Sequence, residues 1–456
     1  MPSRIESVPE PKLGESRTAL DVAEIIASRR FGRFQLGIVV LCTLALFSAG
    51  FATQMMSALA PAVARSMGVN PGALEPIFRY GGYGILIGLL LFAPLADWIG
   101  RKPVLLGSMA LFTVLTLASV WAQTVTQLAV LRFVTGIGLG AIVPSTLAIT
   151  ADYMPRRSRA MLTLVVWYGF AVGSGVAGPI AAYTLTNHRW PAVFVLAGFL
   201  PVILLPVLWT GVPESLLLLV RRGEQANLSI RAGLIRISRR YDRLRVSEFT
   251  TSETMERGVP LLMLFQRDRA PITILLWIVF FTGLLAIFFV NAWTPSVLKT
   301  AEYSEFTANI VAGLMQFGGM LGGIGGCYLA GRLDRFLAIG AAFVLGALSI
   351  IALSLFSNSL IVAAALFLVG FFVFGAQNAA TAIAAASYPS FMRATGAGWA
   401  LGIGRTGQII APTVGGYVLL LKWNLHHLLD LVAVPTLIAG IAAIAIASSG
   451  RHFGRE

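Results

Sequence analysis

Apolar residues fall into twelve long runs along the chain, each about as long as a membrane-spanning helix. A bilayer core of about 30 Å is crossed by roughly 20 apolar residues in an α-helix. The runs lack the alternating ten-residue pattern of a membrane β-barrel. They predict an all-α membrane protein with twelve transmembrane helices. The predicted spans are 35–60, 76–96, 103–122, 127–151, 158–184, 191–211, 270–296, 306–331, 336–356, 359–387, 395–421 and 428–449.

The composition supports this prediction. Of the 456 residues, 57% are hydrophobic and 12% are charged, and the mean hydropathy is +0.81. A water-soluble domain of this size does not carry so little charge. Cys42 and Cys327 both lie inside apolar runs, which indicates small buried side chains and neither a disulfide nor a metal site. No cofactor is expected.

The net charge of +14 is distributed unevenly over the loops. Lysines and arginines gather between the sixth and seventh runs and in the turns after the second, fourth, eighth and tenth runs. The positive-inside rule therefore predicts an inner-membrane protein with both termini in the cytoplasm. Anionic lipids are the expected neighbours of these loops, and no nucleic-acid partner is expected.

The polar central segment divides the twelve runs into six and six. Within it, residues 221–245 alternate basic and apolar side chains, which favours a helix at the membrane surface. The predicted parts are a cytoplasmic tail (1–34), a six-helix bundle (35–211), a cytoplasmic loop (212–269), a second six-helix bundle (270–449) and a C-terminal tail (450–456).

Two short motifs recur in the two halves. "PLADWIGRKP" (94–103) follows the second run and "AGRLDRF" (330–336) the eighth, and "ADYMPRRSRA" (151–160) follows the fourth and "ASYPSFMRA" (386–394) the tenth. Asp334 lies 237 residues after Asp97, and Pro389 lies 234 residues after Pro155. This nearly constant offset indicates an internal duplication.

With these motifs the chain resembles the major facilitator superfamily. The resemblance implies two six-helix pseudo-repeats that give alternating access to a midplane site. The first motif departs from the superfamily pattern at Ala93, where Gly is usual, and at Trp98, where Arg is usual. Its charge contacts are implied to hold one conformer of the transport cycle. The residues assigned to this conformational role are Asp97, Gly100, Arg101, Lys102, Asp152, Arg159, Asp334, Arg335 and Arg393.

Two longer stretches narrow the resemblance. "RFVTGIGLGAIVPSTLAITADYMPRRSRA" (132–160) and "YPSFMRATGAGWALGIGRTGQIIAPTVGG" (388–416) look like the fourth and eleventh helices of the aromatic acid:proton symporters. "PES" at 213–215 and "GAQNAATAIAAASYP" fit the same pattern. The resemblance implies a monomeric carrier of small aromatic carboxylates such as hydroxybenzoates, and no enzyme.

Arg405 is the strongest candidate for binding the carboxylate. It lies about ten residues into the eleventh run, or ~15 Å deep at ~1.5 Å per residue. A charge at that depth normally faces an aqueous cavity or a partner, and no acidic residue lies in the same run. A bidentate pair with a substrate carboxylate is favoured. A structural contact with backbone carbonyl groups is the alternative.

Arg132 and Asp152 lie near opposite ends of the fourth run. Arg132 is close enough to the outer interface for its side chain to reach it, and the resemblance implies a functional Arg there, so anchoring and function both stay open. Asp152 stands where the family usually has Glu. A solvated cluster with Arg156, Arg157 and Arg159 is expected for it, with gating as the alternative.

Aromatic rings and neutral hydrogen-bonding groups complete the predicted site. An aromatic acid needs apolar faces and a few donors, and packing is the alternative role for each candidate. Gln377 and Asn378 are favoured because adjacent amides in an apolar helix need partners. The other candidates are Tyr83, Trp167, Tyr168, Asn291, Trp293, Phe374 and Trp399.

The first run departs from the symporter pattern in "GFATQMM" (50–56). The symporters carry Asp-Gly-x-Asp twelve residues before a proline, whereas this chain has Ala49-Gly50-Phe51-Ala52, with Pro61 in register. Proton symport needs a titratable group in the cavity. The chain is therefore expected to couple through Glu75, Asp97 or Asp152, to act as a uniporter or exchanger, or to have changed its substrate. A drug exporter, a nicotinate-type importer and a transporter-like sensor remain alternatives.

Overall fold

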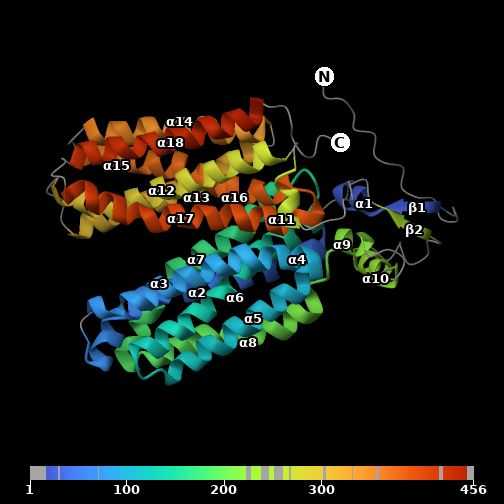
Figure 1. Cartoon of the computed structure of the whole chain (residues 1–456), viewed down its shortest axis with the longest axis horizontal. Helices are drawn as coiled ribbons and strands as arrows, with labels where there is room; N and C mark the ends of the chain where they lie inside the picture. The colour runs from blue at the N-terminus through green and yellow to red at the C-terminus, as the bar shows by residue number, and fades with distance from the viewer. Residues whose placement is uncertain are drawn as a thin grey trace. The chain divides into compact units, whose positions relative to one another are not determined.

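The computed structural model describes residues 17–28, 31–69, 71–221, 227–237, 246–250, 260–266, 269–300, 305–330, 332–355, 359–420 and 425–448. Nearly all of them are helical, and each of the twelve predicted spans lies on a helical segment (Figure 1). Ten helices in this part of the chain are long and apolar enough to cross a membrane, and Phe317–Leu329 is a shorter apolar helix. The prediction of an all-α membrane protein is confirmed.

The chain forms two compact units, and the first comprises Met1–Pro260 and Pro389–Thr395. Within it α2 packs along α7, α3 along α6, and α5 between α6 and α8. The short helix η7 (Ser390–Met392) belongs to this unit although it lies far along the chain. The long helical segments of the first unit are α2 (Arg33–Met67), α3 (Glu75–Ile87), α4 (Ala93–Ile99), α5 (Arg101–Ala118), α6 (Val125–Tyr153), α7 (Arg159–Asn187) and α8 (Pro191–Gly211).

The second unit comprises Leu261–Tyr388 and Gly396–Glu456. Its helix α18 packs on α12 and α14, and α13 packs on α15 and α16. Gly404 and Gly407 bring α17 against the backbone of α12 at Phe280 and Phe281. The helices that lie wholly or mostly in this unit are α11 (Pro260–Met263), α12 (Ala270–Thr300), α13 (Glu305–Leu329), α14 (Arg335–Leu355), α15 (Ser359–Val369), α16 (Gly375–Ser387), α17 (Arg393–Leu420) and α18 (Leu425–Ser448).

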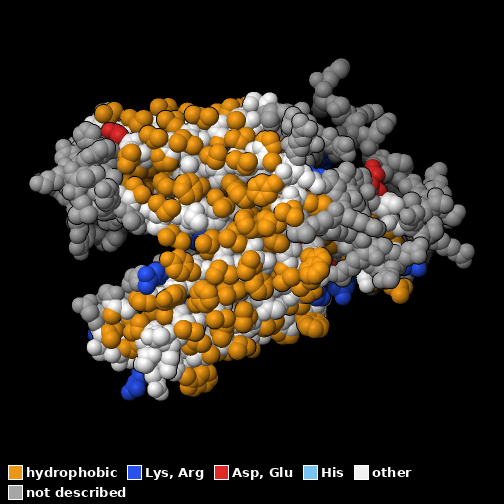
Figure 2. Space-filling view, viewed as in Figure 1, with side chains coloured by type: hydrophobic (Ala, Val, Ile, Leu, Met, Phe, Trp, Pro, Cys, Tyr) orange, Lys and Arg blue, Asp and Glu red, His pale blue; other side chains and the backbone are white. Residues whose placement is uncertain are grey.

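Hydrophobic side chains face both inward and outward on these helices. Large apolar residues such as Leu91, Val114 and Phe199 are exposed, and Figure 2 shows hydrophobic atoms over the helical surface. A helix that is apolar on all sides is buried in protein or surrounded by lipid. Cys42 and Cys327 are buried and form no disulfide, as expected of small buried side chains.

Two helical segments contain a π-helical turn. One runs over Gly88–Phe92 between α3 and α4, and the other over Gly370–Phe374 between α15 and α16. Each begins at a glycine that lies against the backbone of a neighbouring helix, at Ile137 and Met315 respectively. A wider turn at a close helix contact is a feature that hydropathy does not reveal.

The polar parts of the first unit contain two strands that the sequence pattern did not predict. Strand β1 (Arg17–Asp21) of the N-terminal tail pairs in parallel with β2 (Val246–Thr250) of the central segment. Helix α1 (Val22–Ser28) follows β1, and α9 (Leu216–Arg221) and α10 (Asn227–Ile237) precede β2. Helix α10 confirms the middle of the helix expected over 221–245, while 222–226 and 238–245 lie outside the described residues.

The contact between α2 and α7 depends on the absence of side chains. A Cβ atom at Gly173 would overlap the Phe47 carbonyl group, and one at Gly50 would overlap the Phe170 carbonyl group. Small residues allow transmembrane helices to approach this closely. Gly175 also lies on α7, but its added Cβ would meet no atom within 4 Å.

Gly173→Ala is therefore expected to destabilise the protein by about 1–3 kcal/mol, the usual cost of overpacking. Gly175→Ala is the matched control and should be neutral. Thermal unfolding in detergent can be followed with a thiol-reactive dye, because both cysteines are buried. Equal melting temperatures for the two variants would contradict this account of the helix contact.

Candidate functional site

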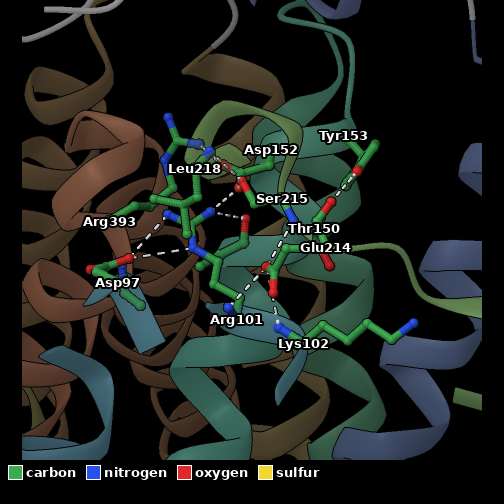
Figure 3. A network of polar contacts seen from close by, with 12 residues as sticks. Asp97, Arg101, Lys102, Thr150, Asp152, Tyr153, Glu214, Ser215, Leu218 and Arg393 are labelled. Carbon is green, nitrogen blue, oxygen red and sulfur yellow. Dashed lines mark hydrogen bonds and ion pairs between the residues drawn. The ribbon is translucent and has the colours of Figure 1, made fainter. Parts of the chain in front are cut away.

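A buried carboxylate, Asp152, lies at the centre of a polar network in the first unit (Figure 3). It accepts a hydrogen bond and ion pair from Nη1 of Arg101 and another from Nη1 of Arg393. Ser215 Oγ donates a third hydrogen bond to it. Asp152 is 1% exposed, and both arginines are equally buried. One carboxylate therefore joins α6, α5 and the segment 389–395.

Asp97 provides the second carboxylate of the network. Its Oδ1 accepts from Arg101 Nη2 at 3.2 Å. The same side chain accepts from the backbone N–H of Ala394 at 3.2 Å and of Thr395 at 2.7 Å, and from Thr395 Oγ1 at 2.9 Å. The N–H groups of a first helical turn have no partners within the helix, and a carboxylate there is favoured by the helix dipole.

Glu214 of the "PES" segment holds the start of α5. Its Oε1 accepts from the backbone N–H of Arg101 at 3.0 Å and of Lys102 at 3.4 Å. Gly100, which lies between α4 and α5, has a φ of 119°, a conformation that residues with side chains rarely adopt. A Cβ at Gly100 would also overlap Glu214 Oε2. Tyr153 Oη donates to the Glu214 carbonyl group, which fixes this segment to α6.

The solvated cluster expected around Asp152 is wrong. Arg156 and Arg157 are exposed on the turn after α6, and the partners of Asp152 come instead from α5 and from residue 393. Two buried arginines and two buried aspartates make the core of the network neutral. Such neutrality is required because an unpaired ion inside a protein costs several kcal/mol.

The departures of the first motif do not prevent this network from forming. Trp98, which stands where the superfamily has Arg, is 72% exposed and so lies at the surface. Ala93 is fully buried. Lys102, which also belongs to this motif, donates a hydrogen bond from Nζ to the carbonyl group of Trp209, near the end of α8.

The second copy of the motif has a different local role. Asp334 Oδ1 accepts from the backbone N–H of Phe336 at 3.0 Å and of Leu337 at 3.1 Å, as an N-cap does. Arg335 is exposed, and Arg159, at the start of α7, is half-buried. The conformational role predicted for these three residues remains a prediction.

Arg132 on α6 is buried and makes one described hydrogen bond. Its Nη2 donates to the carbonyl oxygen of Ala52 on α2 at 2.7 Å. Its Nη1 is buried without a partner, and the residue as a whole is 6% exposed. Among the side chains that the structure describes, no carboxylate forms an ion pair with Arg132. The two roles considered for Arg132, anchoring and function, both remain predictions.

Arg405 on α17 is half-buried in the second unit. Its Nη1 donates to Oε1 of Gln408, one turn further along, at 2.6 Å. The described part of the chain places no carboxylate in an ion pair with it. The alternative role for Arg405 was a structural contact with backbone carbonyl groups. Its described contact is with the neutral side-chain amide of Gln408. This amide satisfies one N–H of Arg405 and does not compensate its positive charge.

The two predicted amides differ in their surroundings. Asn378 Nδ2 donates to the Gly319 carbonyl oxygen at 3.3 Å. Gln377 is 3% exposed, and neither Oε1 nor Nε2 has a hydrogen-bond partner. Its Oε1 lies close beside Gly283 of α12. An unsatisfied buried amide is rare in native structures and calls for an explanation.

The aromatic candidates form three separate groups. Tyr83 meets Tyr80 edge to face at 6.4 Å, Trp167 stacks on Phe170 at 5.5 Å, and Trp399 stacks on Trp277 at 5.6 Å. Trp277 was not predicted, and its buried Nε1 has no partner. Tyr168 and Phe374 are buried and Asn291 is half-buried. The side chain of Trp293 lies outside the described residues.

The apolar helices, the buried ion network around Asp152 and the buried guanidinium of Arg132 are together typical of a multi-pass membrane transport protein. A family model named Major Facilitator Superfamily matches residues 42–412. The chain belongs to the Major Facilitator Superfamily, so it is a transporter and not an enzyme.

Similar proteins extend over almost the whole chain. A gallate transporter of Pseudomonas putida is 37% identical over 93% of this chain and 95% of its own length. A 4-hydroxybenzoate transporter of the same organism is 34% identical over the same shares. Among solved structures, the proton:xylose symporter XylE has a TM-score of 0.66 at 16% identity, covering 91% of this chain and 94% of that one. At this identity the structural likeness concerns the fold alone.

Asp152→Asn tests the network. Asparagine carries no charge, so Arg101 and Arg393 lose the carboxylate that they share. A loss of about 3–5 kcal/mol of stability is expected. Ser215→Ala removes the hydrogen bond to Asp152 and the one that Ser215 Oγ accepts from the Leu218 N–H at 3.3 Å, but it leaves both ion pairs, so it should cost about 1–2 kcal/mol. Thermal unfolding of both variants in one detergent measures the difference, and equal small losses would show that Asp152 does not carry the network.

Proposed function

We propose that the chain transports small aromatic carboxylates across the inner membrane by alternating access. The observation that carries this proposal is Arg405, a guanidinium in an apolar helix whose described partner is the neutral Gln408. Relatives at 37% and 34% identity are named gallate and 4-hydroxybenzoate transporters, and both substrates are aromatic carboxylates. The names of these relatives favour aromatic carboxylates over drug-like compounds as the transported substrates.

A carboxylate supplies what Arg405 lacks. A guanidinium inside a membrane needs a counter-charge, and its planar N–H groups match the two oxygens of a carboxylate. Gln408 occupies Nη1 with one neutral hydrogen bond. A bound carboxylate supplies the negative charge. The site at Arg405 therefore binds a carboxylate more tightly than a neutral molecule of the same shape.

Gln377 and the tryptophan pair are the proposed contacts for the rest of the substrate. The buried amide of Gln377 has an unused donor and an unused acceptor, which suit a phenolic hydroxyl group. Trp399, stacked on Trp277, offers an apolar face of the kind that aromatic ligands occupy. The other predicted contacts are Asn378, Arg132, Tyr83, Trp167, Tyr168, Asn291 and Trp293.

The buried network is proposed to stabilise one conformation of the cycle. Asp97, Gly100, Arg101, Asp152 and Arg393 hold α4, α5, α6 and residues 389–395 together through interactions within the first unit. The basic segments around it are proposed to face the cytoplasm beside anionic lipids, with both termini there, and the carrier to act as a monomer.

Arg405→Gln should abolish carboxylate binding while leaving membrane insertion intact. Arg405→Lys keeps the charge but loses the paired N–H geometry, so a weaker loss is expected, of about tenfold in affinity, or ~1.4 kcal/mol. Binding of labelled 4-hydroxybenzoate to purified protein measures both. Arg157→Gln, on an exposed turn, is the control. Unchanged affinity in Arg405→Gln would remove the central claim.

The methyl ester of 4-hydroxybenzoate tests the same claim from the ligand side. It keeps the ring and the phenol but carries no charge, so it should compete at least about tenfold less well than the acid. Nicotinate, a pyridine carboxylate, serves as the comparison for ring selectivity. Competition by the ester as strong as by the acid would favour a carrier of neutral compounds. Binding without accumulation in proteoliposomes would favour a sensor.

A further inference from the structure

Arg132 lies buried in the first unit, and no carboxylate among the described side chains compensates its charge. Its Nη2 is bound to the Ala52 carbonyl oxygen at 2.7 Å, and its Nη1 has no partner. A carbonyl group is a dipole and does not neutralise a full positive charge. The network around Asp152 shows the opposite arrangement in the same unit, because its two arginines face two aspartates. The surroundings of Arg132 are therefore those of a cation whose counter-ion arrives from outside the chain.

We propose that this carrier is an anion exchanger in which the transported carboxylate neutralises Arg132. This inference rests on the proposed function, because it takes the substrate to be an organic carboxylate. A conformation that buries Arg132 is disfavoured while the carrier is empty and favoured once an anion pairs with Nη1. The loaded carrier then reorients readily and the empty carrier does not. Entry of one carboxylate becomes tied to exit of another.

Exchange is also supported by the fact that Arg132 cannot act as the proton-carrying group. A guanidinium remains protonated under all physiological conditions, so Arg132 cannot release its charge by giving up a proton. The described acids Asp97 and Asp152 are already engaged by arginines and backbone N–H groups, and the side chain of Glu75 lies outside the described residues. No described side chain supplies the counter-charge of Arg132, which the substrate then provides.

The experiment compares two modes of flux in proteoliposomes with the membrane potential clamped at zero. Labelled 4-hydroxybenzoate is offered to vesicles that are empty inside and to vesicles preloaded with unlabelled 4-hydroxybenzoate. The initial rate is expected to be at least about tenfold higher in the preloaded vesicles. An inward proton gradient should leave that ratio unchanged. Equal rates, or gradient-driven accumulation in empty vesicles, would overturn the inference.

An acid placed beside Arg132 supplies an internal counter-ion and should remove the need for exchange. A Cβ at Gly81 of α3 would lie 3.8 Å from the Arg132 Cβ and meet nothing closer, whereas one at Gly82 would meet no atom within 4 Å. Gly81→Asp is expected to bring the two rates within about threefold of each other, because Arg132 is then neutralised in the empty carrier. Gly81→Asn and Gly82→Asp are the controls for size and for charge.

The outcomes separate the two proposals. If neither vesicle type takes up label, the proposed function is wrong. If uptake occurs and wild-type rates are equal, transport stands and exchange is wrong. If Gly81→Asp inserts normally but keeps the wild-type ratio, Arg132 is not its cause and the inference is wrong. Ala52→Asp, on the residue whose carbonyl touches Arg132, replaces Gly81→Asp if that variant fails to insert.

Discussion

The ion pairs that Asp152 makes with Arg101 and Arg393 are the interaction on which the first unit depends. They bring together side chains that are up to 241 residues apart in the chain. Because all three groups are buried, no member can lose its partners without leaving a charge in a medium that solvates it poorly. A second set of hydrogen bonds, from Ser215 and to Glu214, limits where these ions can move. Such a network is either fully formed or replaced as a whole by another arrangement, as a conformational switch requires.

Arg101, Arg393, Arg132 and Arg405 fall into two classes that have different physical explanations. Arg101 and Arg393 have carboxylate partners within the chain, and their charge contributes to the structure of the first unit. Arg132 and Arg405 have only neutral described partners, a backbone carbonyl group and an amide. The folded chain bears the cost of these two charges, and a ligand carboxylate would reduce that cost. Sequence position alone does not separate the classes, since all four arginines lie in or next to apolar runs.

The sequence predicted the helices well because their cause is local. Twelve runs of bilayer length lie on twelve helical segments, and the Asp97 turn was recognised from contiguous residues. The prediction for Asp152 failed because it considered only sequence neighbours, whereas Arg393 reaches it through the tertiary fold. The unsatisfied amide of Gln377, the Trp277 stack and the π-helical turns are likewise products of packing. The strand pair β1 and β2 joins segments more than 200 residues apart, which no local pattern reveals.

The contact between Arg132 and Ala52 gives the missing acids of the first helix a structural meaning. The symporters resembled by this sequence carry a carboxylate at the position of Ala52, and the structure shows the backbone of that residue against a guanidinium. An aspartate there would place an acid on the residue that already contacts Arg132, whereas an alanine supplies none. Loss of the acid therefore changes two properties at once: it removes a protonation site, and it leaves a permanent charge that only an anion can neutralise. In the proposed exchange mechanism, a carrier with these properties is driven by its substrates and not by protons.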